Sequence, residues 1–230
     1  MLMVCRFKQM FNLKIPSRNF PIVAILFLSS IAAAQDANVA GAGMTDYWAE
    51  ADKFRSNVMN ERAELSIRYE TELLSMWGLL LDPTRLQTDN DFGESREIIE
   101  QGRSVVEKYE SIFLVAFDNS ADQVQDLKLT EAEKRRVVSA YERGMAQSKL
   151  VHQEIWQIEH QKVDEIEKLI DLLSDNRDSW TVDGNRILYS DQELQNQVNE
   201  CIANTGALDR EQMRIRKAAI EAQREKAAMN

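Results

Sequence analysis

The chain has 230 residues and a net charge of −10, because 38 acidic residues outnumber 28 basic ones. Binding to nucleic acid requires clustered Lys and Arg that displace the counterions of the phosphate backbone, and no such cluster follows the first 34 residues, so we exclude nucleic acid as a partner. With eight glycines and three prolines, long stretches carry no helix breaker, and we expect an all-α protein.

The first 34 residues have the three-part layout of a secretory signal peptide. Four basic and no acidic residues come first, an apolar run begins at Phe20, and small residues lead to Ala34. The apolar run is shorter than the roughly 20 residues that span a bilayer. Cleavage between Ala34 and Gln35 is therefore the leading interpretation, and an uncleaved membrane anchor is the alternative. We expect export by the general secretory route to the bacterial periplasm, with the extracellular space as the alternative and no membrane span left after cleavage.

Cleavage would change the chemistry of the chain that remains. It would remove four basic residues and no acidic ones, so the net charge would fall from −10 to −14. It would also remove Cys5 and leave Cys201 as the single cysteine, which excludes an intramolecular disulfide. Leu194, Val198 and Cys201 share one face of a predicted helix, so we expect Cys201 to be buried. An intermolecular disulfide is the alternative.

The mature chain is predicted to begin with a flexible segment, residues 35–44, because its residues are small and unpatterned. Thr45 can cap a helix that runs to about Leu81, since apolar residues recur along it every three or four positions. Pro83 marks the end of this helix, because a proline disfavours the α conformation of the residue before it. The polar stretch from there to Gly93 is predicted to be a loop.

A second helix is predicted from about Glu94. Near its end all six residues of Ile112–Phe117 are apolar, and we expect them to be the most buried segment of the mature protein. Thr130 and Glu133 then form a capping box, in which each side chain bonds to a free amide of the other's turn. This box marks the start of the longest helix, whose apolar face continues to about Leu173.

Three long amphipathic helices with short connections pack best side by side. We therefore predict an elongated antiparallel bundle of three long helices for residues 45–174. Residues 175–206 are predicted to form a hairpin and a short helix that pack on the bundle. Residues 207–230 are predicted to be a charged C-terminal helix or tail.

The small β-hairpin is predicted around residues 179–189. Asp183-Gly184 lies between alternating apolar residues and is favoured in two-residue turns. Ser190 and Glu193 form a second capping box, which opens the short helix. This helix is predicted to end at Gly206.

The sequence carries no catalytic or metal-binding motif that we can identify. The two histidines of the chain, His152 and His160, follow Lys149 and Gln157 by three positions, whereas a carboxylate di-metal site in a bundle requires glutamate there. A Gly-x-Ser-x-Gly motif and a glycine-rich phosphate loop are also absent from the sequence. We therefore predict no enzyme activity, cofactor or metal, and expect both histidines at the surface or boundary of a helix.

We expect the protein to act through protein contacts, as an accessory or scaffold component whose partner is another protein or a second copy. Trp156 lies beside the main apolar face of its helix, and the hairpin that carries Trp180 and Tyr189 needs a surface to pack on. Because Trp and Tyr are enriched at interface hot spots, these three are the predicted contact residues. Two alternatives are the binding of an apolar ligand or lipid beside Ile112–Phe117 and peripheral membrane association through the C-terminal helix.

Overall fold

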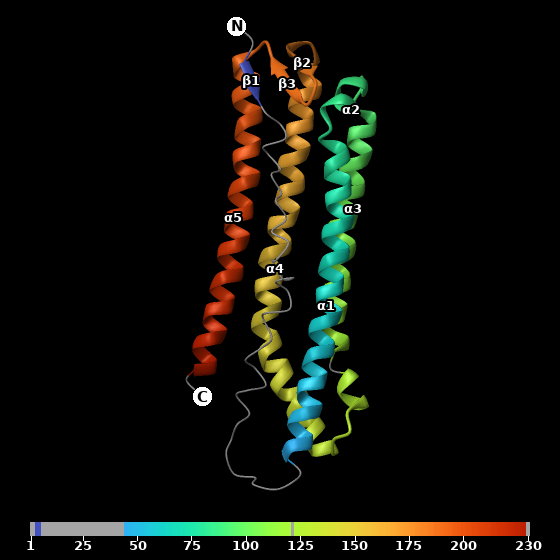
Figure 1. The fold of residues 1–230 in the computed structure, drawn as a ribbon, viewed down its shortest axis with the longest axis vertical. Coiled ribbons are helices and arrows are strands. Elements are labelled where there is room, and N and C mark those ends of the chain that lie inside the picture. Colours follow the sequence, from blue (N-terminus) through green and yellow to red (C-terminus); the bar gives the residue numbers. More distant parts are fainter. Residues whose placement is uncertain (1–2, 6–43, 121, 229–230) are drawn as a thin grey trace. The chain divides into compact units, whose positions relative to one another are not determined.

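The structure, a computed structural model, describes residues 3–5, 44–120 and 122–228 (Figure 1). The predicted cleavage site between Ala34 and Gln35, and residues 35–43, lie outside these ranges. The described chain is a helical bundle with one small antiparallel sheet, which confirms the predicted fold class. Its elements are β1 (Met3–Cys5), α1 (Met44–Leu80), α2 (Pro83–Thr88), α3 (Gly93–Asn119), η4 (Asp122–Asp126), α4 (Glu131–Asp175), η5 (Arg177–Ser179), β2 (Trp180–Asp183), β3 (Arg186–Tyr189) and α5 (Gln192–Ala228).

The elements form two compact units, and α1, α3, α4 and α5 contribute residues to both. The described part of unit 1 comprises residues 3–5, 69–108 and 156–212. The described part of unit 2 comprises residues 44–68, 109–120 with 122–155, and 213–228.

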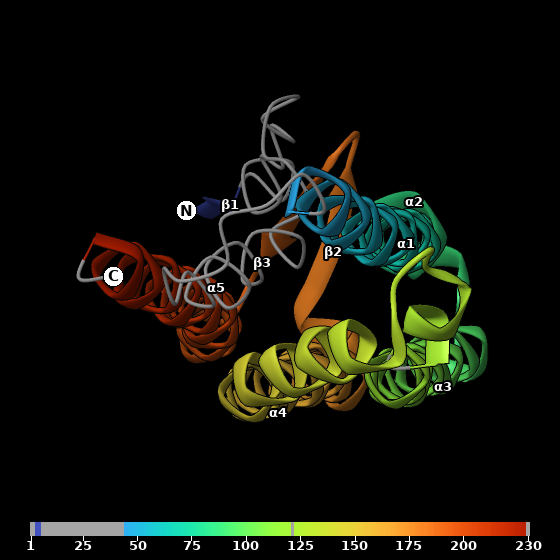
Figure 2. The same ribbon diagram turned by 90° about the horizontal axis from the view of Figure 1, so that it is seen from below.

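In unit 1, neighbouring helices run antiparallel and are joined by polar side chains. Arg103 of α3 donates to Asp164 and Glu167 of α4, at 2.9 and 2.7 Å. Asn204 of α5 donates to Glu165 of α4 at 3.1 Å. These bonds put α4 between α3 and α5, as Figure 2 also shows.

Unit 2 has an apolar core between the start of α1, the end of α3 and the start of α4. The capping box at the start of α4 is confirmed, because Glu133 accepts hydrogen bonds from the amide and the hydroxyl of Thr130 at 2.8 and 2.6 Å. The core of this unit consists of Ala51, Phe54, Val58, Phe117, Val124, Leu127, Val137, Tyr141 and Met145.

The prediction that Ile112–Phe117 is the most buried segment is wrong. Phe113 and Phe117 are buried, but the side chain of Val115 is 52% exposed. An apolar run in a helix points in all directions, whereas α3 meets its neighbours with only part of its circumference. The sequence therefore overstates how much of this segment is covered.

The predicted loop before Gly93 contains a short helix, α2. Asp82 caps it by accepting hydrogen bonds from the amides of Thr84 and Arg85, at 2.8 and 3.1 Å, and Pro83 occupies its first turn. This is the usual arrangement of a capping residue followed by proline at the start of a helix. Asp82-Pro83 thus ends α1 and starts α2.

The predicted end of the short helix at Gly206 is wrong, because α5 continues through Gly206 into the predicted C-terminal helix. Asn204, Asp209 and Gln212 bond to α4 on both sides of the glycine. These contacts offset the roughly 1 kcal/mol that a glycine costs inside a helix. The start of α5 also differs from the predicted box, since the carboxylate of Asp191 accepts the amide of Glu193 at 2.8 Å.

The hairpin is confirmed and gains a third strand. Trp180 pairs with Tyr189 and Asp183 pairs with Arg186 across β2 and β3, and Gly184 has a φ of 59°. A positive φ at the first central residue is what a type II′ turn requires. On the other side of β3 lies β1, so the strand order is β1-β3-β2.

Replacing Gly184 with alanine should lower the free energy of unfolding by about 1 kcal/mol, because an L-residue is strained at positive φ. Nothing lies within 4 Å of the added methyl group, so the cost comes from the backbone alone. Urea denaturation measures it. The matched variant Asn185→Ala should change stability by less than about 0.5 kcal/mol, and equal effects of the two substitutions would contradict the turn geometry.

Candidate functional site

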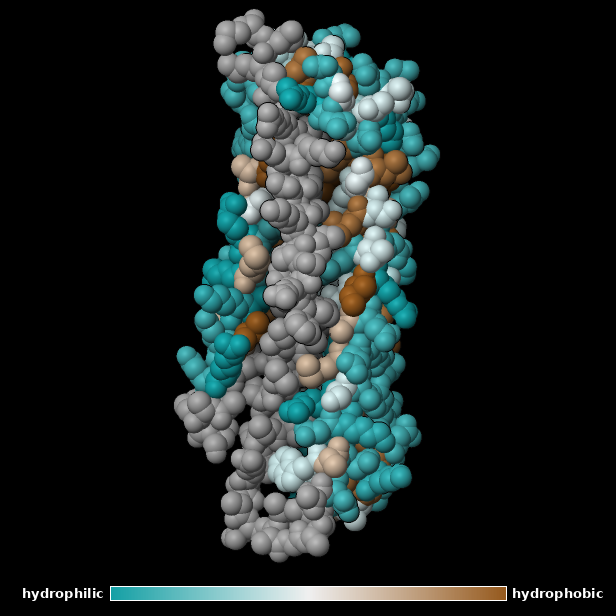
Figure 3. Space-filling view, in the orientation of Figure 1, coloured by the Kyte–Doolittle hydropathy of each residue, from teal (hydrophilic) through white to brown (hydrophobic). Residues whose placement is uncertain are grey.

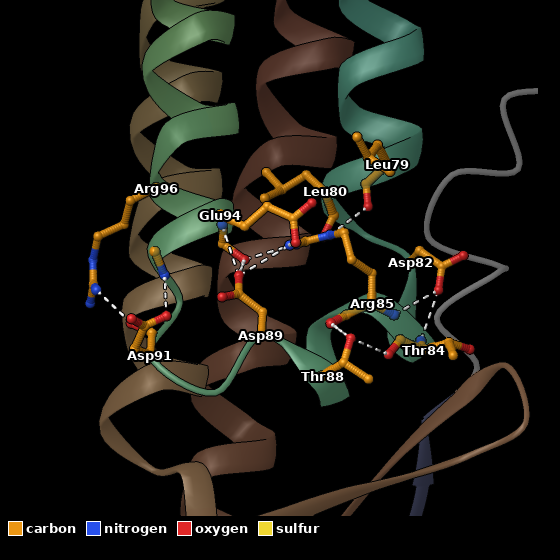
Figure 4. A network of polar contacts seen from close by, with 12 residues as sticks. Leu79, Leu80, Asp82, Thr84, Arg85, Thr88, Asp89, Asp91, Glu94 and Arg96 are labelled. Carbon is orange, nitrogen blue, oxygen red and sulfur yellow. Dashed lines mark hydrogen bonds and ion pairs between the residues drawn. The ribbon is translucent and has the colours of Figure 1, made fainter.

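A buried polar cluster, formed by Arg85, Asp89 and Ser95, lies at the corner where α2 joins α1 to α3 (Figure 4). The Asp89 carboxylate accepts hydrogen bonds from the amide and the hydroxyl of Ser95 at 2.8 and 2.7 Å, and from Arg85 at 3.1 Å. Arg85 also donates to the Ser95 hydroxyl at 2.8 Å. We call these three residues the corner cluster. Every member is bonded to the other two.

Arg85 extends the corner cluster to the end of α1. Its guanidinium donates to the carbonyl oxygens of Leu79 and Leu80, at 3.0 and 2.8 Å. The last carbonyls of a helix have no partner within the helix, so an arginine is well suited to bind them. One side chain therefore fastens the end of α1 to the start of α3.

The protonation state of Asp89 follows from these bonds. Burial, the largest single influence, raises its pKa, but the hydrogen bonds from Ser95 and Arg85 together outweigh burial and lower the pKa below the ordinary value. Asp89 is therefore an ionised carboxylate at neutral pH. Its oxygens are used to hold the corner.

The corner continues into the hairpin through aromatic contacts. Phe92 packs its ring against the ring of Trp180 with 6.2 Å between centroids, and the guanidinium of Arg177 lies 4.4 Å from the Trp180 centroid. Trp180 also donates its indole N–H to the carbonyl of Leu173 at 2.8 Å. The hairpin is thus fixed to the end of α4 and to the α2–α3 connection.

Phe92 is held in a backbone conformation that is rare for its residue type. Its φ is 57° and its side chain is 1% exposed. A bulky residue in this region stores about 1–3 kcal/mol of strain and persists only where the surroundings fix it. The contact with Trp180 is one such constraint.

In unit 2, a buried arginine lies among aromatic side chains. Arg62 of α1 donates to the hydroxyl of Tyr141 at 2.8 Å and to that of Ser120 at 3.4 Å, and its guanidinium lies 3.9 Å from the Phe117 centroid. Burial lowers the pKa of Arg62 to about 10, against the favourable effect of Tyr141. The side chain is still charged at neutral pH.

His152 lies in the same interior and was predicted wrongly as a boundary residue. It is 2% exposed and packs against Phe113 and Phe117, with ring centroids 6.1 and 4.8 Å away. Burial, with smaller contributions from Arg62 and Arg216, lowers the pKa of His152 to about 3. The imidazole is therefore neutral at physiological pH.

Unit 1 has a second polar cluster inside the bundle. Glu159 of α4 is 8% exposed and accepts a hydrogen bond from the hydroxyl of Tyr69 at 2.9 Å and another from Gln212 of α5. Lys162 donates to Gln212 at 3.1 Å and pairs with Asp209 at 2.6 Å. The cluster joins α1, α4 and α5 of this unit.

The predicted contact residues lie in the interior. Trp156, Trp180 and Tyr189 are 5%, 2% and 3% exposed, so they do not offer surface to a partner in this fold. Trp156 packs against Tyr69 with 5.2 Å between ring centroids. Cys201 is 1% exposed, as its helical spacing predicts.

Among the described residues, no group of three or more His, Cys, Asp and Glu side chains could hold a metal ion. None of the described helices combines the length and apolar composition needed to cross a bilayer. The coloured surface in Figure 3 is largely hydrophilic, with hydrophobic residues scattered over it.

No protein-family model, curated protein or solved structure matches the chain. Its function is therefore inferred from its own residues.

The corner cluster gives a direct test of its role. Replacing Asp89 with alanine should lower the free energy of unfolding by about 2–3 kcal/mol, because buried donors of Arg85 and Ser95 lose their acceptor. Urea denaturation measures the change. The neighbouring exposed Asn90 provides the matched control, and Asn90→Ala should alter stability by less than about 0.5 kcal/mol. A loss no larger than that of the control would show that the cluster does not hold the corner.

His152 makes the stability of the fold dependent on pH. Its folded pKa of about 3 lies below the ordinary value of 6.5, so the unfolded chain binds the proton more readily between these values. The free energy of unfolding should then fall by about 1.4 kcal/mol per pH unit as the pH drops below 6.5. Protonation of carboxylates also changes the stability in acid. The measurement therefore compares the free energy of unfolding of the native chain with that of His152→Gln between pH 7 and 4. Parallel stability curves would contradict the buried neutral imidazole.

Proposed function

We propose that the protein is exported and acts through contacts with other proteins, as an accessory or scaffold component. The signal-peptide layout of the first 34 residues supports export. The bacterial periplasm is the proposed destination.

One observation carries the proposed contact function: polar and charged side chains in the interior form hydrogen bonds with one another. Asp89 accepts bonds from Ser95 and Arg85, Glu159 accepts from Tyr69 and Gln212, and Arg62 donates to Tyr141. Groups whose bonds run from one helix to another align the helices. This supports a fixed alignment of the helices within each unit, with an activity that resides on the outer surface.

Several large apolar side chains are exposed on that surface. In unit 2, Val115 of α3, Leu150 of α4 and Met213 of α5 are 52%, 62% and 57% exposed. Single exposed apolar residues are common in monomeric proteins, but interfaces use such side chains as contact points. These three residues are therefore the positions to probe for a partner.

The test is site-specific photo-crosslinking in the native cell. A photo-reactive amino acid is placed at Val115, Leu150 or Met213 in turn, and adducts are identified by mass spectrometry. Exposed Gln153, one helical turn from Leu150, is the matched control. We expect a discrete adduct with another protein from at least one apolar position, and at least tenfold less of it from Gln153.

Other outcomes would contradict the proposal. Absence of a protein adduct, together with a lipid or small apolar molecule that co-purifies with the protein, would favour the ligand-binding alternative. Pelleting with vesicles that depends on the part of α5 after Gly206 would favour membrane association. A recovered protein that still begins with the first residues of the chain would contradict cleavage.

A further inference from the structure

The free edge of the hairpin is occupied by a segment that the sequence predicts to be removed. β1 pairs antiparallel with β3, with Met3 opposite Tyr189, Val4 opposite Leu188 and Cys5 opposite Ile187. Figure 1 shows β1 beside β3. Cleavage after Ala34 would take β1 away. The edge of β3 would then be without its strand in the exported protein.

The register defines what this edge presents. Arg186 and Asp183 flank the two-residue turn and form a hydrogen-bonded pair of the antiparallel ladder. Such pairs alternate along a strand, so the backbone N–H and C=O groups of Arg186 and Leu188 point toward β2. Those of Ile187 and Tyr189 therefore point toward β1. Loss of β1 would expose two N–H and two C=O groups along one edge.

The side chains next to the edge are apolar and fixed in place. Ile187 and Tyr189 are 0% and 3% exposed and lie on the inner face of the sheet, together with Trp180. Leu188 lies on the outer face and is half-buried. Because Trp180 anchors the hairpin to α4, the edge is ordered before a strand arrives, which lowers the entropic cost of binding.

We propose that the exported protein uses the edge of β3 to bind an extended segment of a partner protein, which adds to the sheet as an antiparallel strand in place of β1. This inference rests on the proposed export and contact function. The strand supplies apolar side chains at two alternate positions, opposite Tyr189 and Ile187, where Met3 and Cys5 lie in β1. Addition of a strand to an open edge is a general mode of peptide recognition, in which backbone bonds give affinity and alternate side chains give specificity.

Two features of the edge favour an occupant over an open edge. The hairpin is already ordered by its contacts with α4, and a third strand adds backbone hydrogen bonds to it. Proteins usually protect free edges with charged or proline residues, whereas the central residue of this edge is Leu188. The chain itself demonstrates the fit, because its own strand of Met3–Cys5 is accommodated there.

The first experiment uses the exported protein, recovered from the compartment to which it is exported. Mass spectrometry determines its N-terminal residue. A synthetic peptide of residues 1–8 is the probe, kept reduced, and hydrogen exchange reports on the amides of Ile187 and Tyr189. By the register, the amide of Cys5 faces β3 and that of Val4 faces away. Peptides methylated at one or the other nitrogen are therefore matched controls.

We expect the exported chain to begin near Gln35 and the peptide to protect both amides. Methylation at Cys5 should weaken binding about tenfold relative to methylation at Val4, because it removes one backbone hydrogen bond. Equal binding of the two methylated peptides, no protection, or an exported chain that retains Met3–Cys5 would overturn the proposal.

A second measurement identifies the occupant in the cell. A photo-crosslinker is placed at Leu188 on β3 or at Thr181, which lies directly opposite on β2 and is exposed. We expect an adduct with another protein from Leu188 and at least tenfold less from Thr181. An adduct between two copies of the chain, equal yields or no adduct would overturn strand addition by a partner. Adducts from Val115, Leu150 or Met213 without one from Leu188 would support the proposed function while rejecting this inference.

Discussion

The contact between Asp89 and the start of α3 is the interaction on which the fold of unit 1 depends. Two antiparallel helices need a chain reversal that leaves no buried amide or carbonyl without a partner. Asp89 meets this need at the start of α3 by binding the Ser95 amide, and Arg85 meets it at the end of α1 by binding two carbonyls. The two residues also bind each other. The corner is therefore closed by one connected set of bonds.

The hairpin depends on this corner through Phe92. The backbone of Phe92 is strained, and its ring is directed onto Trp180. A shift of the corner would move Phe92 and disturb its ring contact with Trp180. Phe92 thus links the corner cluster to the hairpin, although the residues are far apart in the sequence.

Unit 2 uses a different solution to align its helices. A charged Arg62 and a neutral His152 lie among aromatic rings, with Tyr141 and Ser120 as hydrogen-bond partners of the arginine. Buried polar groups of this kind can select one alignment of helices, since any slip would separate them from their partners. Apolar packing alone would tolerate more than one register.

The sequence predicted those parts of the fold that depend on neighbouring residues. The spacing of apolar residues predicts α1, Thr130 and Glu133 predict the start of α4, and Asp183-Gly184 predicts the hairpin. Each is a local pattern with a local physical cause. The corner cluster was missed, because Asp89 and Ser95 come together only after the polar stretch around them has folded. The single available signal was Asp82-Pro83, which marks the start of α2.

Errors at the candidate sites have a common cause, which is that tertiary contacts decide burial. His152 is in the interior because Phe113 and Phe117 of α3 cover it. The helix α5 continues through Gly206 because residues on both sides of the glycine bind α4. Trp156, Trp180 and Tyr189, the predicted contact residues, are buried for the same reason. The pairing of β1 with β3 joins residues more than 180 positions apart, and no local pattern can indicate it.

The most direct test of this account is a double-mutant cycle between Asp89 and Trp180. The free energy of unfolding is measured for Asp89→Ala, Trp180→Leu and the double variant. If the corner cluster positions Phe92 and through it the hairpin, the two substitutions should be coupled by about 1 kcal/mol, with the double variant less destabilised than the sum of the single variants. Additive effects, within about 0.3 kcal/mol, would contradict the claim that the corner holds the sheet.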